Sequence, residues 1–248
     1  MENPATYGDG WELRLGDCLD PVTGLASLGD KSVDHVITDP PYSRFTHGKN
    51  RGNELGGMAA LTPIEFSEVT EEQRAGLCRE SFRVSRRWSL VWSDAEGITP
   101  WVESVEASGL EHVRVGFWVK EGASPQFSGD RPGTGAEALL IGHRPGRKKW
   151  NGGGRVGIWT FPVLGQARET RVHTTQKPLA LMEALVRDFT DPGELVCDPF
   201  AGSGTTGVAC IRLGRRFIGW ERDPKYHAVA VKRLRAAREQ LGLWTGAA

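Results

Sequence analysis

The stretch that most constrains the fold is a glycine-rich turn between an apolar strand and a helix. Residues 195–197 (Leu-Val-Cys) predict a buried strand, and residues 204–213 predict a helix. Between them, Gly202, Gly204 and Gly207 fit the pattern G-x-G-x-x-G, which is informative only in this strand-to-helix context. The arrangement is typical of a nucleotide-binding turn in an open sheet of parallel strands.

The rest of the chain alternates apolar strands with amphipathic helices. Such alternation predicts an α/β fold with a doubly wound, mostly parallel sheet, and 248 residues suit a single domain spanning 1–248. Thr70 is expected to cap one of the helices. Strands are predicted at 11–15, 32–38, 88–92, 112–120, 137–143, 195–197 and 216–220, and helices at 70–86, 99–108, 179–189, 204–213 and 224–241.

A second unusual stretch, Asp39-Pro40-Pro41-Tyr42, ends the predicted strand at 32–38. Each proline fixes its own φ and restricts the residue before it, so this corner is rigid. Asp39 and the Pro40 carbonyl can each accept one hydrogen of an amino group, and Tyr42 can stack on a ring. The corner therefore fits a planar substrate with an NH2 group. The alternative is a proline turn with a capping aspartate.

Two acids accompany the glycine turn. Asp198 precedes it, and Glu221 ends the next strand, 221 − 202 = 19 residues after Gly202, where an acid takes ribose hydroxyls. Asp198 would repel a pyrophosphate but attract an ammonium, and no lysine follows the glycines as in nucleoside triphosphate loops. S-Adenosylmethionine, which has a cationic amino-acid end and an adenosine end, fits best. A dinucleotide and a plain Asp-capped turn are the alternatives.

The composition is that of an ordinary globular protein without net charge. Lys plus Arg and Asp plus Glu both number 31, so the overall charge gives no argument for nucleic acid. No apolar run has the length of a membrane span and the N-terminus shows no signal pattern, so a cytoplasmic protein is expected. The cysteines form no C-x-x-C pair, and we expect reduced thiols and no metal site. They are Cys18, Cys78, Cys197 and Cys210.

Together, the motifs at Asp39 and Asp198 resemble the amino-group DNA methyltransferases, which methylate adenine N6 or cytosine N4. The motif at Asp39 comes first, as in the permuted beta group of that family. Residues 16–19 (GDCL), 173–178 (HTTQKP) and 219–221 (GWE) also resemble it, so the likeness spans about 11–236. Thr174 stands where the family often has proline. The resemblance implies a circularly permuted, seven-stranded, mostly parallel sheet with one antiparallel strand.

The resemblance also implies roles for individual residues. Asp39, Pro40, Pro41 and Tyr42 would be catalytic: two accepted hydrogen bonds localise the lone pair of the target nitrogen, which attacks the sulfonium methyl and leaves S-adenosylhomocysteine, without a metal. Glu221 would bind the ribose, Asp17 and Cys18 the adenine ring, and Lys177 would lie near the amino-acid end. The full set of expected cofactor contacts is Asp17, Cys18, Lys177, Asp198, Phe200, Ala201, Gly202, Ser203, Gly204, Thr205, Thr206 and Glu221.

Contact with DNA has to come from local charge. Residues 144–177 hold eight Lys and Arg and a single acid, Glu169, with Trp150 and Trp159 between them. The segment at about 144–172 matches the place where the family inserts its target-reading segment, and the stretch 44–51 within the polar loop at 43–57 is a second candidate. The partner is expected to be duplex DNA, with the target base flipped out. Expected DNA contacts are Arg44, Lys49, Arg51, Arg147, Lys148, Lys149 and Arg155.

Adenine N6 is the preferred target because Asp39 leads the motif, where cytosine-N4 relatives more often have serine. Cytosine N4 is the alternative. A protein of another class, which binds nucleic acid and keeps the cofactor fold without catalysis, is disfavoured by the intact Asp39 and Tyr42. The sequence leaves open the recognition site, a restriction partner and a homodimer.

Overall fold

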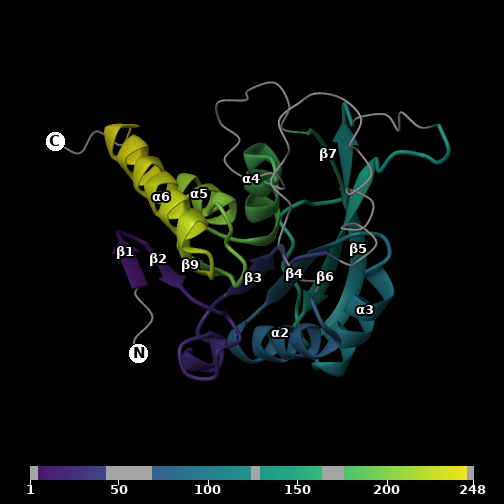
Figure 1. Ribbon diagram of the computed structural model, residues 1–248, viewed down its shortest axis with the longest axis horizontal. Coiled ribbons are helices and arrows are strands. Elements are labelled where there is room, and N and C mark those ends of the chain that lie inside the picture. The colour runs from purple at the N-terminus through teal and green to yellow at the C-terminus, as the bar shows by residue number, and fades with distance from the viewer. Residues whose placement is uncertain (1–4, 43–68, 124–128, 164–175, 245–248) are drawn as a thin grey trace.

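The computed structural model describes residues 5–42, 69–123, 129–163 and 176–244 (Figure 1). The strands are β1 (Ala5–Gly8), β2 (Trp11–Leu15), β3 (His35–Thr38), β4 (Trp88–Ser93), β5 (Glu111–Glu121), β6 (Ala136–His143), β7 (Ile158–Pro162), β8 (Leu195–Asp198) and β9 (Arg216–Glu221). The helices are α2 (Glu71–Val84), α3 (Ile98–Ala107), α4 (Leu179–Phe189), α5 (Thr205–Arg212) and α6 (Pro224–Trp244), with a short 3-10 turn, η1 (Leu25–Ser27).

The described strands form one sheet in the order β1-β2-β9-β8-β3-β4-β6-β5-β7. β1 is antiparallel to β2, and β6 is antiparallel to both of its neighbours; all other pairs are parallel. The predicted α/β class is confirmed. The described sheet has nine strands, of which β1 and β6 are antiparallel to their neighbours, where seven strands with one antiparallel strand were expected. The two strands that were not predicted are β1 and β7. Both are short strands at the sheet's edges, bonded to one neighbour only, so little apolar periodicity is needed to hold them.

Helices cover both faces of the sheet, as a doubly wound fold requires (Figure 1). Successive residues of a strand point to opposite faces. Accordingly, Ile37 and Leu90 pack in the core cluster that includes residues of α4, α5 and α6, whereas Val36 and Val91 pack in the cluster with α2 and α3. The predicted cap of α2 is confirmed, because the Thr70 hydroxyl accepts from the Gln73 amide.

The strand order creates a switch point between β8 and β3. From β8 the chain passes through α5 to β9 on one side, and from β3 it passes through α2 to β4 on the other. In open α/β sheets, ligands bind outside the carboxyl ends of the strands at such a point. We call the edge where β2, β9, β8, β3 and β4 end the carboxyl edge, and the opposite edge the amino edge.

Within the described part of the chain, no helix is long and apolar enough to cross a membrane. All four cysteines are buried and unbridged. They therefore belong to the packed interior of the fold.

Candidate active site

The carboxyl edge brings together the acids that the sequence singled out. Asp198 is the last residue of β8, Glu221 is the last residue of β9, and Asp39 directly follows β3. β8 pairs with both β9 and β3, so the three acids end neighbouring strands, which lie about 4.8 Å apart in a sheet. Asp17 follows β2, which pairs with β9 on its other side.

Asp39 presents its two carboxylate oxygens differently. Its Oδ2 accepts a hydrogen bond from the Lys177 Nζ at 2.6 Å, whereas its Oδ1 is buried and has no hydrogen-bond partner among the described residues. Burial raises the pKa of Asp39, and the Lys177 ammonium partly offsets this effect. A buried oxygen without a partner is costly, so Oδ1 is ready to accept a hydrogen from a ligand.

Lys177 lies at the centre of this corner. It is 7% exposed, and its Nζ lies 2.8 Å from the Tyr42 hydroxyl and 3.0 Å from Glu137 Oε2, besides its bond to Asp39. Its Nζ also lies over the rings of Tyr42 and Trp92, at 5.0 and 5.2 Å. Burial disfavours the charged ammonium, but the carboxylates of Asp39 and Glu137 outweigh burial and raise the pKa of Lys177.

The resemblance placed Lys177 near the amino-acid end of a cofactor; in the structure its ammonium contacts Asp39 and Tyr42, two of the residues predicted to be catalytic. The reason is tertiary: β3 and β6 flank β4, so the acids Asp39 and Glu137 both reach the segment that precedes α4. Two oppositely charged neighbours within hydrogen-bond distance then hold the ammonium there.

Glu137 and Lys120 complete the corner, and sequence reasoning missed both. The Tyr42 hydroxyl donates to Glu137 Oε2 at 2.7 Å, and the Lys120 Nζ lies 2.7 Å from Glu137 Oε1. Burial alone would raise the pKa of Glu137, but Lys177 and Lys120 lower it to about 2. The one signal available in the sequence was an acid at the start of an otherwise apolar strand, directly before Ala138-Leu139-Leu140-Ile141.

The glycine turn surrounds Asp198 with donors. Its Oδ2 accepts from the Thr206 hydroxyl at 2.6 Å and its Oδ1 from the Phe200 amide at 3.1 Å. Asp198 is 2% exposed, and burial raises its pKa to about 7. Gly202 and Gly204 have φ of 53° and 79°, a region that favours glycine, and a side chain at Gly204 would meet Ala230 of α6 at 3.0 Å.

The turn is tied to neighbouring elements. The Ala201 amide donates to the Trp220 carbonyl, and the Arg233 guanidinium of α6 donates to the carbonyl and hydroxyl of Ser203. Thr205 begins α5 and also accepts from Arg233. The predicted cofactor residues 198–206 therefore form one compact turn beside Glu221.

Glu221 and Asp17 differ in exposure. Glu221 is buried, and its Oε1 accepts from the Asp223 amide at 2.7 Å; burial is the main cause that raises its pKa. Asp17 is exposed, and its Oδ1 accepts from the Leu19 amide, so it closes a turn after β2. The neighbouring Cys18 thiol is buried, which raises its pKa. Contact of Asp17 and Cys18 with an adenine ring stays a prediction.

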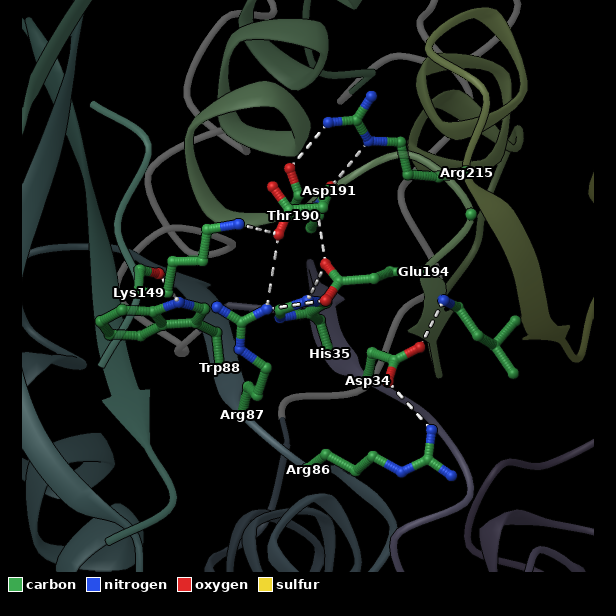
Figure 2. Close-up of polar contacts among 12 residues, drawn as sticks. Asp34, His35, Arg86, Arg87, Trp88, Lys149, Thr190, Asp191, Glu194 and Arg215 are labelled. Carbon is green, nitrogen blue, oxygen red and sulfur yellow. Dashed lines mark hydrogen bonds and ion pairs between the residues drawn. The ribbon is translucent and has the colours of Figure 1, made fainter. Parts of the chain in front are cut away.

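The first part of the basic run of residues 144–177, namely residues 144–149, lies at the amino edge, at the other end of the strands from Asp39. The antiparallel strand β6 ends there, and Lys148 and Lys149 form ion pairs with Glu111 at the start of β5 and with Asp191, which precedes β8. Figure 2 shows Lys149 beside Asp191, within a polar cluster that includes Arg87, Glu194 and the buried His35. The sequence of this run contains one acid, Glu169, but the fold places Glu111 and Asp191 of other elements beside its lysines.

The predicted DNA-reading insert is partly sheet and core. Trp159 belongs to β7, is buried, and donates to Asp188 of α4, which also pairs with Arg155. Trp150 packs against Trp159 and Phe189. Contact of Arg147, Lys148, Lys149 and Arg155 with DNA stays a prediction, and their place at the amino edge counts against it. Arg44, Lys49 and Arg51 lie outside the described residues.

Groups of three or more His, Cys, Asp or Glu side chains placed to hold a metal ion do not occur among the described residues. The polar groups at the corner are the carboxylates of Asp39 and Glu137, the ammonium groups of Lys120 and Lys177, and the Tyr42 hydroxyl.

Comparison with known proteins identifies the family. The chain is 29% identical to the DNA adenine methyltransferase YhdJ of Escherichia coli, over 88% of this chain and 81% of the relative. It resembles the crystal structure of the M1.HpyAVI–SAM complex with a TM-score of 0.67 and 26% identity, covering 90% of this chain and all of that one. The cytosine-N4-specific PvuII DNA methyltransferase shares the fold at 15% identity, with a TM-score of 0.72 and coverage of 97% and 95%. Residues 33–232, most of the chain, match the DNA methylase family N6_N4_Mtase, and the chain therefore belongs to that family of DNA amino-methyltransferases.

Proposed function

We propose that this protein transfers a methyl group from S-adenosylmethionine to adenine N6 in DNA. The observation that carries the proposal is the buried Oδ1 of Asp39, which has no hydrogen-bond partner among the described residues and lies beside the Asp198 turn. Because Asp39 and Asp198 lie at the ends of neighbouring strands, an amine that donates a hydrogen bond to Asp39 lies close to a ligand held at Asp198.

The residues of the glycine turn fit S-adenosylmethionine. Asp198 is suited to its ammonium and Glu221 to its ribose hydroxyls, while the positive φ of Gly202 and Gly204 lets the backbone approach the ligand closely. The M1.HpyAVI structure, a complex with this cofactor, supports the assignment. When bound, the cofactor supplies an electrophilic sulfonium methyl.

The corner at Asp39 activates the amine. An exocyclic amine is a poor nucleophile because its lone pair is delocalised into the ring. Asp39 Oδ1 and the Pro40 carbonyl would each accept one N–H, which localises the lone pair on nitrogen. The carboxylate also stabilises the positive charge that develops there, and the Lys177 ammonium, 2.6 Å away, favours the ionised form of Asp39.

The target base must leave the duplex to reach this corner. The ring of Tyr42 would replace part of the stacking that the base loses, worth about 1–3 kcal/mol. Burial raises the pKa of Tyr42 well above its usual value, so its hydroxyl stays protonated and donates to Glu137. That bond anchors the ring in place.

The surface that holds the duplex is proposed at the carboxyl edge. Arg44, Lys49 and Arg51 follow Tyr42 closely in the sequence, so they are the first candidates for contacts with phosphates. The residues of the basic run are second candidates because their ion pairs lie at the amino edge.

Adenine is proposed as the target for two reasons. Aspartate leads the catalytic motif, and YhdJ, a DNA adenine methyltransferase, is similar over most of both chains. The likeness to the cytosine-N4-specific enzyme, at 15% identity, concerns the fold.

The deciding experiment is transfer of a labelled methyl group to duplex DNA, followed by mass spectrometry of the nucleosides. N6-Methyladenine is the expected product, and Asp39→Ala should form none while binding cofactor within about tenfold of the unchanged protein. N4-Methylcytosine would overturn the choice of base. Absence of any transfer to DNA, or tighter binding of a nicotinamide dinucleotide than of S-adenosylmethionine, would overturn the proposal itself.

A further inference from the structure

We propose that Glu137 is a positioning residue of the transfer reaction, which holds Lys177 and Tyr42 so that one oxygen of Asp39 stays free for the target amine. The inference rests on the proposed function, because it concerns the same amine. Glu137 acts on Asp39 through Lys177 and Tyr42. It contacts both of these side chains, and Lys177 in turn contacts Asp39.

The sheet explains why an acid reaches this corner. β6 is antiparallel to β4, so it begins where β4 ends, at the carboxyl edge. Glu137 is its second residue and lies opposite Trp118 of β5, close to Lys120 near the end of that strand. Its side chain is only 14% exposed. A carboxylate is rarely buried in a strand unless charged or hydrogen-bonding partners surround it.

Both oxygens of Glu137 are occupied by groups of the corner. Oε2 accepts from the Tyr42 hydroxyl at 2.7 Å and lies 3.0 Å from the Lys177 Nζ, while Oε1 lies 2.7 Å from the Lys120 Nζ. The cluster of Asp39, Glu137, Lys120 and Lys177 thus contains two carboxylates and two ammonium groups. Buried ion pairs of this kind are weak evidence for stability and better evidence for a fixed arrangement.

The bonds of Lys177 show what that arrangement achieves. An ammonium has three donors, and three oxygens lie within 3.0 Å of the Lys177 Nζ: Asp39 Oδ2, the Tyr42 hydroxyl and Glu137 Oε2. No donor is left for Asp39 Oδ1. Without the negative charge of Glu137, the freed donor of Lys177 would turn to Oδ1, which is buried and lacks a partner among the described residues. Lys177 would then compete with the amine.

Glu137 also holds the side chain of Tyr42 in place. Its hydroxyl donates to Glu137 and accepts from Lys177, so both directions of its hydrogen bonding are satisfied. The ring is thereby fixed at the corner where the base is proposed to stack. Misplacement of a reacting group by about 1 Å can cost about 100-fold in rate.

The test is Glu137→Gln, which keeps the shape of the side chain and removes its charge. We expect kcat for methyl transfer to fall by about 10- to 100-fold. The affinity for S-adenosylmethionine should change by less than about twofold, because Asp198 and Glu221 lie on other strands. Glu121→Gln is the matched control: it removes an exposed acid at the end of β5 and should leave kcat unchanged.

A second variant separates positioning from a merely structural role. Glu137→Gln combined with Lys120→Met restores the charge balance of the cluster, so the melting temperature should recover. kcat should stay low, because Lys177 and Tyr42 still lack their anionic partner. Recovery of kcat to the wild-type value in this double variant would overturn the inference, and so would an unchanged kcat in Glu137→Gln. If the wild type itself transfers no methyl group to DNA, the proposed function fails instead.

Discussion

Replacing Lys177 with methionine should make methyl transfer require a higher pH. In the proposed mechanism, Asp39 accepts the amine hydrogen and stabilises the charge on nitrogen as a carboxylate, so it must be ionised. Burial raises the pKa of Asp39, and the Lys177 ammonium, 2.6 Å away, acts in the opposite direction. Methionine is similar in size but uncharged, so it removes the opposing effect and the pKa of Asp39 rises further.

The size of the shift follows from the geometry. An opposite charge within hydrogen-bond distance lowers the pKa of a carboxyl group by about 1–3 units, and each unit corresponds to about 1.4 kcal/mol. The side chain of Asp39 is 28% exposed, so water screens part of the interaction. Glu137 then remains beside Asp39 without the cation between them and adds to the rise. We therefore expect the acidic limb of the pH–rate profile to move upward by at least about one pH unit.

The assay is the single-turnover rate of methyl transfer, measured from about pH 5 to 9 with saturating cofactor and DNA. The acidic limb of the profile, where the rate rises with pH, should move upward in Lys177→Met. Lys120→Met is the matched control, because Lys120 contacts Glu137 and not Asp39. A limb that moves by less than about half a unit in Lys177→Met would refute the reasoning, since a cation at 2.6 Å must affect the ionisation of Asp39.

Three further predictions concern the cofactor, stability and DNA. Burial raises the pKa of Asp198 to about 7, so binding of S-adenosylmethionine near that pH should release a proton; calorimetry in buffers of different ionisation enthalpy should detect it, and Asp198→Asn should abolish it. Glu194 contacts His35, Arg87 and the Asp191 amide, and these contacts outweigh burial and lower its pKa from 4.5 to about 2. The contribution of Glu194 to the free energy of unfolding is therefore present above pH 4.5 and is lost as the pH falls towards 2. Glu194→Gln should therefore lower the free energy of unfolding at neutral pH by up to about 3 kcal/mol in urea titrations and flatten its loss in acid. Alanine at residues 147–149 should leave the salt dependence of duplex binding unchanged, because the ion pairs of Lys148 and Lys149 lie at the amino edge; a slope lower by about 0.9 per lost contact would show that they bind phosphates.

Local patterns in the sequence determined much of the fold and both principal motifs. The helix predicted at 179–189 is α4, with the same bounds, because its apolar residues recur at helical spacing and Pro178 precedes it. Asp39 and Asp198 could be placed at the carboxyl edge because each follows a short apolar run that forms a parallel strand. These features depend on residues close together in the chain, which a single sequence displays directly.

Only the tertiary structure decided which charges meet. Glu137 and Lys120 reach the corner at Asp39 because β6 lies between β4 and β5 and runs antiparallel to both. A hairpin of β5 and β6 is consistent with the Gly/Pro-rich span between them, but no local pattern specifies that β6 pairs with β4. The same is true of Lys148 and Lys149, which look like a free basic patch in the sequence but find acids on other elements. The energy of an ion pair depends on distance in space and on burial, and both arise only when strands far apart in sequence are placed side by side.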